Sequence, residues 1–338
     1  MKQTLLKAAG EVILQDVGLP IPQPDELLIR VSYAGVCGSD KHSFRGSHPF
    51  RSAPVVLGHE LSGTVAAMGA SVEGFTLGDP VTVMPYVACG TCRYCRMGRD
   101  NLCEDKVVPG QDWAGTFGEY FVSPAAVTFK LGEHTGLDLG ALAEPLAVGV
   151  HSASRARIQA GTQALVLGGG SIGLLTAAAA HLAGADSVAV TDLYEHNLAV
   201  ARQLGAEHTY PASRAGLVDA IHQDYPDGFD VIFLTSGAGA TFQQALALAQ
   251  RGARVIVSAF FTREVSLSFL MVTIHELELL GSQIYQREDF GAALAYLDAM
   301  PLPFASLITH TMPLDRAQEA LSMLDHHSED VIKVLLAP

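Results

Sequence analysis

Four of the five cysteines stand close together in one short stretch of the chain, a pattern that binds metal. They are spaced Cys89-x2-Cys92-x2-Cys95-x7-Cys103. Structural zinc takes four thiolates in a tetrahedron, and short spacings let one loop provide every ligand. Disulfides and an iron–sulfur cluster are the alternatives, but the x2 spacings favour a metal over disulfides, and no proline follows Cys103 as in the ferredoxin pattern. We therefore predict a structural zinc lobe at about residues 86–106.

The fifth cysteine offers a second metal ligand. It begins the segment Cys37-Gly-Ser-Asp-Lys-His42, and a Gly58-His59-Glu60 triplet follows downstream. A thiolate, an imidazole and a carboxylate leave one coordination position open for water or substrate, as a catalytic zinc requires. From these residues alone, His59 could equally be a buried core histidine and Glu60 a solvated surface carboxylate.

A glycine-rich turn indicates a dinucleotide site. The strand predicted at 164–167 runs into a G-x-G-x-x-G pattern, and a helix is predicted to begin near Ser171. The first glycine allows the turn, the second lets the backbone approach a pyrophosphate, and the third permits close helix–strand packing, while free N–H groups at the helix start attract phosphate. The residues of this turn expected to contact the cofactor are Gly168, Gly170, Ser171, Ile172 and Gly173.

Asp192 supports the dinucleotide hypothesis because it follows the next predicted strand, 187–191. A carboxylate at this distance from the turn binds the ribose hydroxyls and repels a 2′-phosphate, so NAD is favoured over NADP. The alternative interpretation is a turn aspartate that caps the helix predicted over 195–204.

The elements that must position these residues fall into two patterns. Up to about residue 145, short strands are broken by glycine and proline, which predicts an irregular β domain. After residue 148, strands and alanine-rich amphipathic segments alternate, as in a parallel sheet wound with helices. The predicted strands are 26–32, 61–65, 80–84 and 119–122 in the first part, then 164–167, 187–191, 230–234, 254–258 and 277–281 in the second. We therefore expect an α/β protein with domains at 1–148 and 149–285, and a return of 286–338 to the first domain.

Charge and composition exclude several classes of protein. The formal net charge of −14 disfavours nucleic acid and anionic membranes as partners, and we interpret the local cluster Arg93, Arg96 and Arg99 as a solvated lobe or subunit contact. No signal-peptide pattern is found at the N-terminus, so we expect a cytoplasmic protein. The uncharged stretch 164–185 is long enough to cross a bilayer, but its glycines favour a buried strand, turn and helix.

Together these motifs resemble the medium-chain zinc-dependent alcohol dehydrogenase family, in its sorbitol, threonine and butanediol dehydrogenase branch. The resemblance covers nearly the whole chain and implies a GroES-like β domain followed by a Rossmann doubly wound parallel sheet. The motifs that carry it are Cys37-Gly-Ser-Asp-x-His42, Gly58-His59-Glu60, the four-cysteine lobe, Gly115-Thr-Phe-Gly-Glu-Tyr120, Ala143-Glu-Pro-Leu-Ala-Val148 and the glycine turn.

The resemblance implies two zinc ions per chain. Cys37, His59 and Glu60 would ligate the catalytic zinc, while Glu144 would supply a fourth carboxylate or hold the zinc-bound water. Glu144 could instead be a helix-start carboxylate before a proline, which the helix dipole favours. The four cysteines of the lobe would hold the structural zinc.

The resemblance also implies a mechanism. Zinc would act as a Lewis acid on the substrate oxygen, and hydride would pass from carbon to nicotinamide. Ser39 and His42 match the family's proton relay, and either could instead be an ordinary turn residue. Asn197 stands where the family often has a basic residue, five positions after Asp192, a departure that we expect to loosen adenosine binding.

The expected substrate class rests only on the resemblance to the sorbitol, threonine and butanediol dehydrogenase branch. We expect a secondary alcohol, with a polyol or sugar alcohol favoured and L-threonine or a vicinal diol as alternatives, and a homodimer or homotetramer. Phe44, Phe117 and Glu144 are candidate pocket residues. The sorbitol branch has an arginine near the end of the last sheet strand where this chain has Ile284, which counts against sorbitol itself. An inactive binding protein on the same frame is disfavoured because the implied ligands and relay residues are all present.

Overall fold

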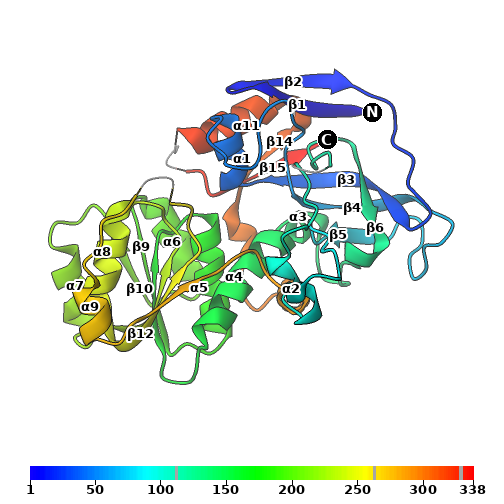
Figure 1. Cartoon of the computed structure of the whole chain (residues 1–338). Coiled ribbons are helices and arrows are strands. Elements are labelled where there is room, and N and C mark those ends of the chain that lie inside the picture. Colours follow the sequence, from blue (N-terminus) through cyan, green and yellow to red (C-terminus); the bar gives the residue numbers. More distant parts are fainter. Residues whose placement is uncertain (111–112, 262–263, 327–329) are drawn as a thin grey trace. The chain divides into compact units, whose positions relative to one another are not determined.

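The computed structural model describes residues 1–110, 113–261, 264–326 and 330–338 and divides the chain into two compact units (Figure 1). Unit 1 comprises Met1–Glu144 and Phe290–Pro338, and unit 2 comprises Pro145–Asp289. Unit 1 is therefore built from two segments that are separated in the sequence by the whole of unit 2.

Unit 1 is organised around one mixed sheet whose long central strand is β3 (Glu26–Val36). The strand order is β14 (Ile308–Pro313), β15 (Lys333–Ala337), β3, β4 (Glu60–Met68), β5 (Pro80–Val83) and β7 (Thr128–Lys130), with β6 (Tyr120–Pro124) also paired to β3. A separate hairpin joins β1 (Lys2–Ala8) and β2 (Glu11–Asp16). In β3, Gly35 pairs with Glu60 and Val36 with Val334, so this strand brings three distant segments to one place.

The helical elements of unit 1 are short. They are α1 (Gly38–Phe44), α2 (Arg93–Arg96), α3 (Leu137–Gly140) and α11 (Ala317–Asp325), with 3-10 turns at Asp100–Leu102, Ala125–Val127, Phe304–Leu307 and Leu314–Arg316. Two further helices cross the boundary between the units in the sequence, α4 (Ala143–Ala156) and α10 (Arg287–Ala299). Because α1 begins directly after β3, the loop between them carries Cys37 at the end of a rigid strand.

Unit 2 is a parallel sheet with helices between its strands. The strand order is β10 (His208–Pro211), β9 (Ser187–Asp192), β8 (Gln163–Leu167), β11 (Phe229–Leu234), β12 (Ala249–Val257) and β13 (Glu278–Gly281). The helices are α5 (Ser171–Leu182), α6 (Glu195–Gln203), α7 (Leu217–Asp224), α8 (Gly239–Leu248) and α9 (Phe269–Ile274). The chain runs outward from β8 in one direction and then from β11 in the other, so the strand order reverses between β8 and β11. In open parallel sheets, ligands bind at the point where the strand order reverses.

The core of unit 2 explains why its strands read as continuous apolar runs. Leu165, Leu167, Ile232 and Leu234 are fully buried, because helices cover a parallel sheet on both faces. The uncharged stretch 164–185 is β8, a turn and α5, as expected. Among the described residues, no helix is both long and apolar enough to cross a membrane.

The predicted α/β fold is confirmed, but some strands differ in extent and others were not predicted, among them β1, β2, β7, β14 and β15. β3 continues to Val36 and β12 begins at Ala249, whereas the sequence predicted strands at 26–32 and 254–258. The strand β10 was not predicted, because His208-Thr-Tyr-Pro211 has no apolar run and includes a proline. It lies at the edge of the sheet, where a proline without an N–H is tolerated.

Candidate metal and cofactor sites

The fold brings Cys37, His59 and Glu60 together. Cys37 follows β3, His59 precedes β4, and Glu60 is the first residue of β4, which is antiparallel to β3. One ligand atom from each residue lies within 4.8 Å of the others, and His59 and Glu60 are buried. The three side chains that the sequence assigned to one metal are thus neighbours in space. Their thiolate, imidazole and carboxylate form a donor set that fits zinc.

Glu60 also forms a buried ion pair that was not predicted from the sequence. Lys333, on β15, donates from Nζ to Oε1 at 2.8 Å and to Oε2 at 2.7 Å, and both side chains are almost completely buried. Burial alone would lower the pKa of Lys333, but the Glu60 carboxylate raises it above its ordinary value. A Cβ at Gly35 would collide with Glu60 Oε2, so this pair requires glycine there. The only signal in the sequence was a lysine within an apolar strand.

Glu144 lies near this ion pair but not in the three-residue cluster. It occupies the first turn of α4 and is buried, and its charge is one of those that raise the pKa of Lys333. Its carboxylate is not among the mutually close ligand atoms of Cys37, His59 and Glu60. The geometry therefore places Glu144 close enough to act on the site without showing it as a ligand.

His59 is oriented by Asp40, a residue of the Cys37–His42 motif to which the sequence analysis assigned no role. Asp40 is fully buried, its Oδ1 lies 3.6 Å from His59 Nδ1, and its Oδ2 accepts from the backbone N–H of Cys37 at 3.0 Å. Burial would raise the pKa of Asp40, but His59 and Arg51 lower it to about 2. Burial would lower the pKa of His59, but Asp40 and Cys37 raise it well above its ordinary value. Asp40 and Arg51, whose Nη1 lies 3.4 Å from Nδ1, both contact the Nδ1 side of the ring, so Nε2 is the nitrogen that can bind a metal.

Arg51 adds a buried positive charge next to these residues. Its Nη1 lies 3.5 Å from Asp40 Oδ1 and 3.4 Å from Ser39 Oγ. Its Nε is buried and donates to no atom of the residues that the structure describes. The guanidinium is therefore only partly satisfied by the protein, and the sequence pattern gave no signal of it.

The proposed relay residues lie on α1. Ser39 Oγ is 3.5 Å from His59 Nε2, which puts the hydroxyl next to the candidate zinc ligands. His42 is three residues further along the same helix and so projects from a neighbouring position. Burial, Lys41 and Arg45 lower the pKa of His42, which favours a neutral imidazole that can accept a proton.

The four-cysteine lobe is a second, separate cluster. Ligand sulfurs of Cys89, Cys92, Cys95 and Cys103 lie within 4.8 Å of one another. Cys92 Sγ is 3.4 Å and Cys89 Sγ 3.9 Å from Cys95 Sγ, close to the roughly 3.8 Å edge of a tetrahedron with Zn–S distances of about 2.3 Å. Without a metal, backbone N–H groups of Thr91 and Cys92 lower the pKa of Cys89 to about 6, whereas burial and the neighbouring thiols raise the pKa of Cys95 to about 12. The lobe fits zinc.

The glycine turn has the geometry that a dinucleotide requires. Gly168 has φ of +112°, which favours glycine, and a Cβ at Gly173 would collide with the carbonyl oxygen of Gly168. A Cβ at Gly170 would meet nothing within 4 Å, so this backbone is open to a ligand. Ser171 Oγ, at the start of α5, is buried and has no partner among the described residues. An orphaned hydroxyl at a helix N-terminus fits a phosphate group.

Asp192 is held at the end of β9 by three donors. The backbone N–H of Gly169 donates to Oδ2 at 2.7 Å, while the N–H of Tyr194 and the Nδ2 of Asn197 donate to Oδ1 at 2.9 and 3.0 Å. Asn197 therefore helps to fix the carboxylate, a role that the sequence analysis did not give it. The α6 helix begins at Glu195 with Tyr194 as its N-cap, so Asp192 is not the N-cap.

Comparison with known proteins identifies the family. Residues 23–133 match the alcohol dehydrogenase GroES-like domain, and residues 171–299 match the zinc-binding dehydrogenase family. The chain is 32% identical to sorbitol dehydrogenase from Bacillus subtilis, over 100% of this chain and 97% of that protein. It is 34% identical to L-threonine 3-dehydrogenase from Deinococcus deserti, over 94% of each.

A solved structure agrees with these matches. A zinc-binding dehydrogenase from Sinorhizobium meliloti 1021, bound to NADP, superimposes with a TM-score of 0.94 at 31% identity, covering 100% of this chain and 99% of that one. The chain belongs to the medium-chain zinc-dependent alcohol dehydrogenase family and is an oxidoreductase of that kind.

Proposed function

We propose that this enzyme oxidises a secondary alcohol of the polyol or sugar-alcohol class with NAD as hydride acceptor. The observation that carries the proposal is the convergence of Cys37, His59 and Glu60. The similarity to sorbitol dehydrogenase supports the substrate class. We further propose two zinc ions per chain, one held by Cys37, His59 and a carboxylate, and one held by the cysteine lobe.

When bound, the catalytic zinc supplies a Lewis acid for the substrate oxygen and the dinucleotide takes up the hydride. The protein's own residues position these groups and transfer the proton of the substrate hydroxyl. Asp40 lies 3.6 Å from the imidazole of His59, and we assign to Ser39, whose Oγ is 3.5 Å from His59 Nε2, the step that takes the proton of the substrate hydroxyl and passes it on. His42, whose lowered pKa favours the neutral imidazole, is the next residue that accepts the proton. Lys333 holds the Glu60 carboxylate in place through a buried ion pair.

The preference for NAD rests on Asp192. Its carboxylate is fixed by Gly169, Tyr194 and Asn197, and a fixed negative charge at this position repels a 2′-phosphate. The NADP bound to the Sinorhizobium relative makes this preference worth testing directly. We expect kcat/KM with NAD to exceed that with NADP, and Asp192→Ser to reduce the ratio. An equal or greater efficiency with NADP would contradict the assignment.

The substrate proposal is tested by a panel of polyols, vicinal diols, sugar acids and L-threonine, with NADH absorbance as the readout. A chelator that removes zinc should abolish the signal, and added zinc should restore it. NAD reduction with polyols would support the proposal. Chelator-sensitive activity on another class would replace the substrate while keeping the reaction, and inactivity of the zinc-loaded enzyme on every secondary alcohol would overturn both.

Arg51 favours a second candidate, a hydroxy substrate that carries a carboxylate, such as L-threonine. Its guanidinium is buried beside Ser39 and keeps an unpaired Nε among the described residues, and carboxylates bind guanidinium groups strongly. The similarity to L-threonine 3-dehydrogenase points the same way. The panel separates the candidates because it includes neutral and acidic hydroxy compounds.

We also propose a cytoplasmic homo-oligomer. Phe269 and Leu270 on α9 expose 62% and 64% of their surface, and Ile274 on the same helix exposes 49%. Contiguous exposed apolar side chains mark interaction surfaces. Light scattering coupled to size exclusion should give a mass of two or four chains, and a monomer at micromolar concentration would contradict the proposal.

A further inference from the structure

Unit 2 contains a threonine that bonds to the glycine turn from a neighbouring strand. Thr235 directly follows β11, while Gly168 directly follows β8. These two strands pair in parallel, with Leu234 opposite Leu167. Thr235 and Gly168 therefore lie side by side at the carboxyl edge of the sheet, where the strand order reverses.

The hydroxyl of Thr235 donates to the turn itself. Its Oγ1 lies 2.6 Å from the carbonyl oxygen of Gly168 and 3.1 Å from that of Leu167. A hydroxyl has one hydrogen, and the shorter distance assigns it mainly to Gly168. The same carbonyl oxygen lies against the start of α5, because a Cβ at Gly173 would collide with it. Thr235 therefore bonds to a carbonyl group that is packed against the first turn of α5.

The N–H of the same peptide group is bonded on its other side. The peptide bond between Gly168 and Gly169 is trans, so its C=O and N–H point in opposite directions. The N–H of Gly169 donates to Asp192 Oδ2 at 2.7 Å. Asp192 ends β9 and Thr235 follows β11, so the two bonds come from the strands on either side of β8. Together they form a clamp on one peptide plane.

This peptide plane needs a clamp because glycine lets the chain rotate it. Gly168 has φ of +112° and is followed by two further glycines, so the stretch has unusual rotational freedom. A rotated plane would turn a carbonyl oxygen, instead of the N–H, towards the Asp192 carboxylate, and the two negative ends would repel each other. Hydrogen bonds that order the turn in advance reduce the entropy cost of binding a ligand there.

We propose that Thr235 is a positioning residue for the dinucleotide, which acts by clamping the Gly168–Gly169 peptide together with Asp192. The clamp keeps the backbone at Gly170 open to the pyrophosphate, since a Cβ there would meet nothing within 4 Å. It also holds the Asp192 carboxylate for the ribose. Thr235 acts through the backbone and needs no contact with the cofactor. The inference rests on the proposed binding of NAD at this turn.

The hydroxyl is tested by comparing Thr235→Ser with Thr235→Ala, which differ only in that group. In the zinc-loaded enzyme, calorimetry should show the Kd of NAD and of ADP-ribose raised about threefold to tenfold in Thr235→Ala, but within about twofold of the parent in Thr235→Ser. The KM for NAD should rise in parallel while kcat changes little, because the clamp acts on binding and not on hydride transfer. Hydrogen exchange at residues 168–173 of the NAD-free enzyme should be faster in Thr235→Ala than in Thr235→Ser.

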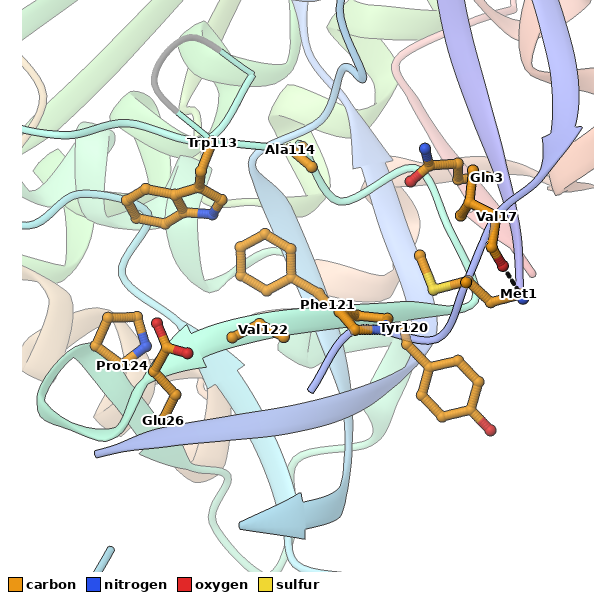
Figure 2. Close-up of a pocket in the computed structure, with 13 residues that line it drawn as sticks. Met1, Gln3, Val17, Glu26, Trp113, Ala114, Tyr120, Phe121, Val122 and Pro124 are labelled. Carbon is orange, nitrogen blue, oxygen red and sulfur yellow. Dashed lines mark hydrogen bonds between the residues drawn. The ribbon is translucent and has the colours of Figure 1, made fainter. Parts of the chain in front are cut away.

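Thr128 provides a matched control in unit 1. Its buried Oγ1 donates to the carbonyl of Pro124 at 3.0 Å. Pro124 lines the groove that Figure 2 shows, whose lining includes no residue of the glycine turn. Thr128→Ala removes a comparable hydroxyl bond, so it should lower Tm but leave the Kd of NAD at the parental value. An equal rise of Kd in Thr128→Ala would mean that lost stability weakens binding, and would refute the inference.

The double variant Thr235→Ala/Asp192→Ala tests whether the two residues act together. If they hold one peptide, the loss of NAD affinity caused by Thr235→Ala should be smaller in the Asp192→Ala background than in the parent. Equal losses in both backgrounds, or a parental Kd in Thr235→Ala, would overturn the inference and leave the proposed NAD binding intact. A parent enzyme that binds neither NAD nor ADP-ribose would instead refute the proposed function, and the inference with it.

Discussion

The two metal clusters of unit 1 are built in opposite ways. The cysteine lobe takes all four ligands from residues 89–103, and its donors are sulfurs supported by neighbouring backbone N–H groups. The Cys37–His59–Glu60 cluster joins two strands, and its counter-charges include Lys333, from a third strand. A local site needs only its loop, whereas the second site needs the complete sheet. The first can therefore stabilise the fold, and the second depends on it.

The largest effect that this comparison predicts is on catalysis. Cys37→Ser removes one ligand of the open site, and we expect turnover to fall by at least about a thousandfold while NAD affinity and Tm change little. Steady-state rates, NAD titration and thermal melting measure this. A Cys37→Ser enzyme with appreciable activity would refute the zinc assignment.

The matched change in the lobe should affect stability. Cys103→Ser replaces a buried ligand, so we expect the loss of one zinc per chain and a Tm lower by roughly 10 °C or more, because metal binding contributes directly to folding. Elemental analysis and calorimetry are the measurements. If Cys103→Ser kept two zinc ions and the parental Tm, the lobe would not be a metal site.

Removal of Lys333 tests how strongly the Cys37–His59–Glu60 cluster depends on the ion pair with strand β15. In the zinc-free protein, Lys333→Met leaves the Glu60 carboxylate buried without its ion-pair partner, and we expect a loss of about 3–5 kcal/mol in the free energy of unfolding. The double variant Lys333→Met/Glu60→Gln removes both charges and should recover much of that loss in a denaturant titration. Equal destabilisation in the single and double variants would mean that packing, not charge, is lost.

The smallest expected effect distinguishes the two substrate candidates. If the substrate carries a carboxylate that Arg51 binds, Arg51→Met should raise its KM by about 10- to 100-fold, with little change in kcat or in the KM of a neutral polyol. Arg51→Lys, which keeps the charge, serves as the control and should show a smaller effect. A parallel rise in KM for acidic and neutral substrates would show that Arg51 acts only through Asp40 and His59.

The sequence was sufficient to predict what depends on short spacing. The lobe, the glycine turn and the central strands of unit 2 were predicted because their ligands, glycines and apolar runs are contiguous. The counter-charges of the open site were not predicted, because Arg51 and Lys333 reach it only through folding and match no local pattern. The strand β10 was not predicted for another reason: an edge strand can be short and polar, so it lacks an apolar run.

The Lys333–Glu60 pair also has a consequence for the order in which the protein is made. The two residues are 273 positions apart, and ribosomes add about 5–20 residues per second. The carboxylate is therefore synthesised roughly 14 to 55 s before its cation. During that interval the nascent chain can close the cysteine lobe, but the Glu60 carboxylate stays in water because its ion-pair partner has not yet been made. The last sheet strand thus completes the reactive centre only late in translation.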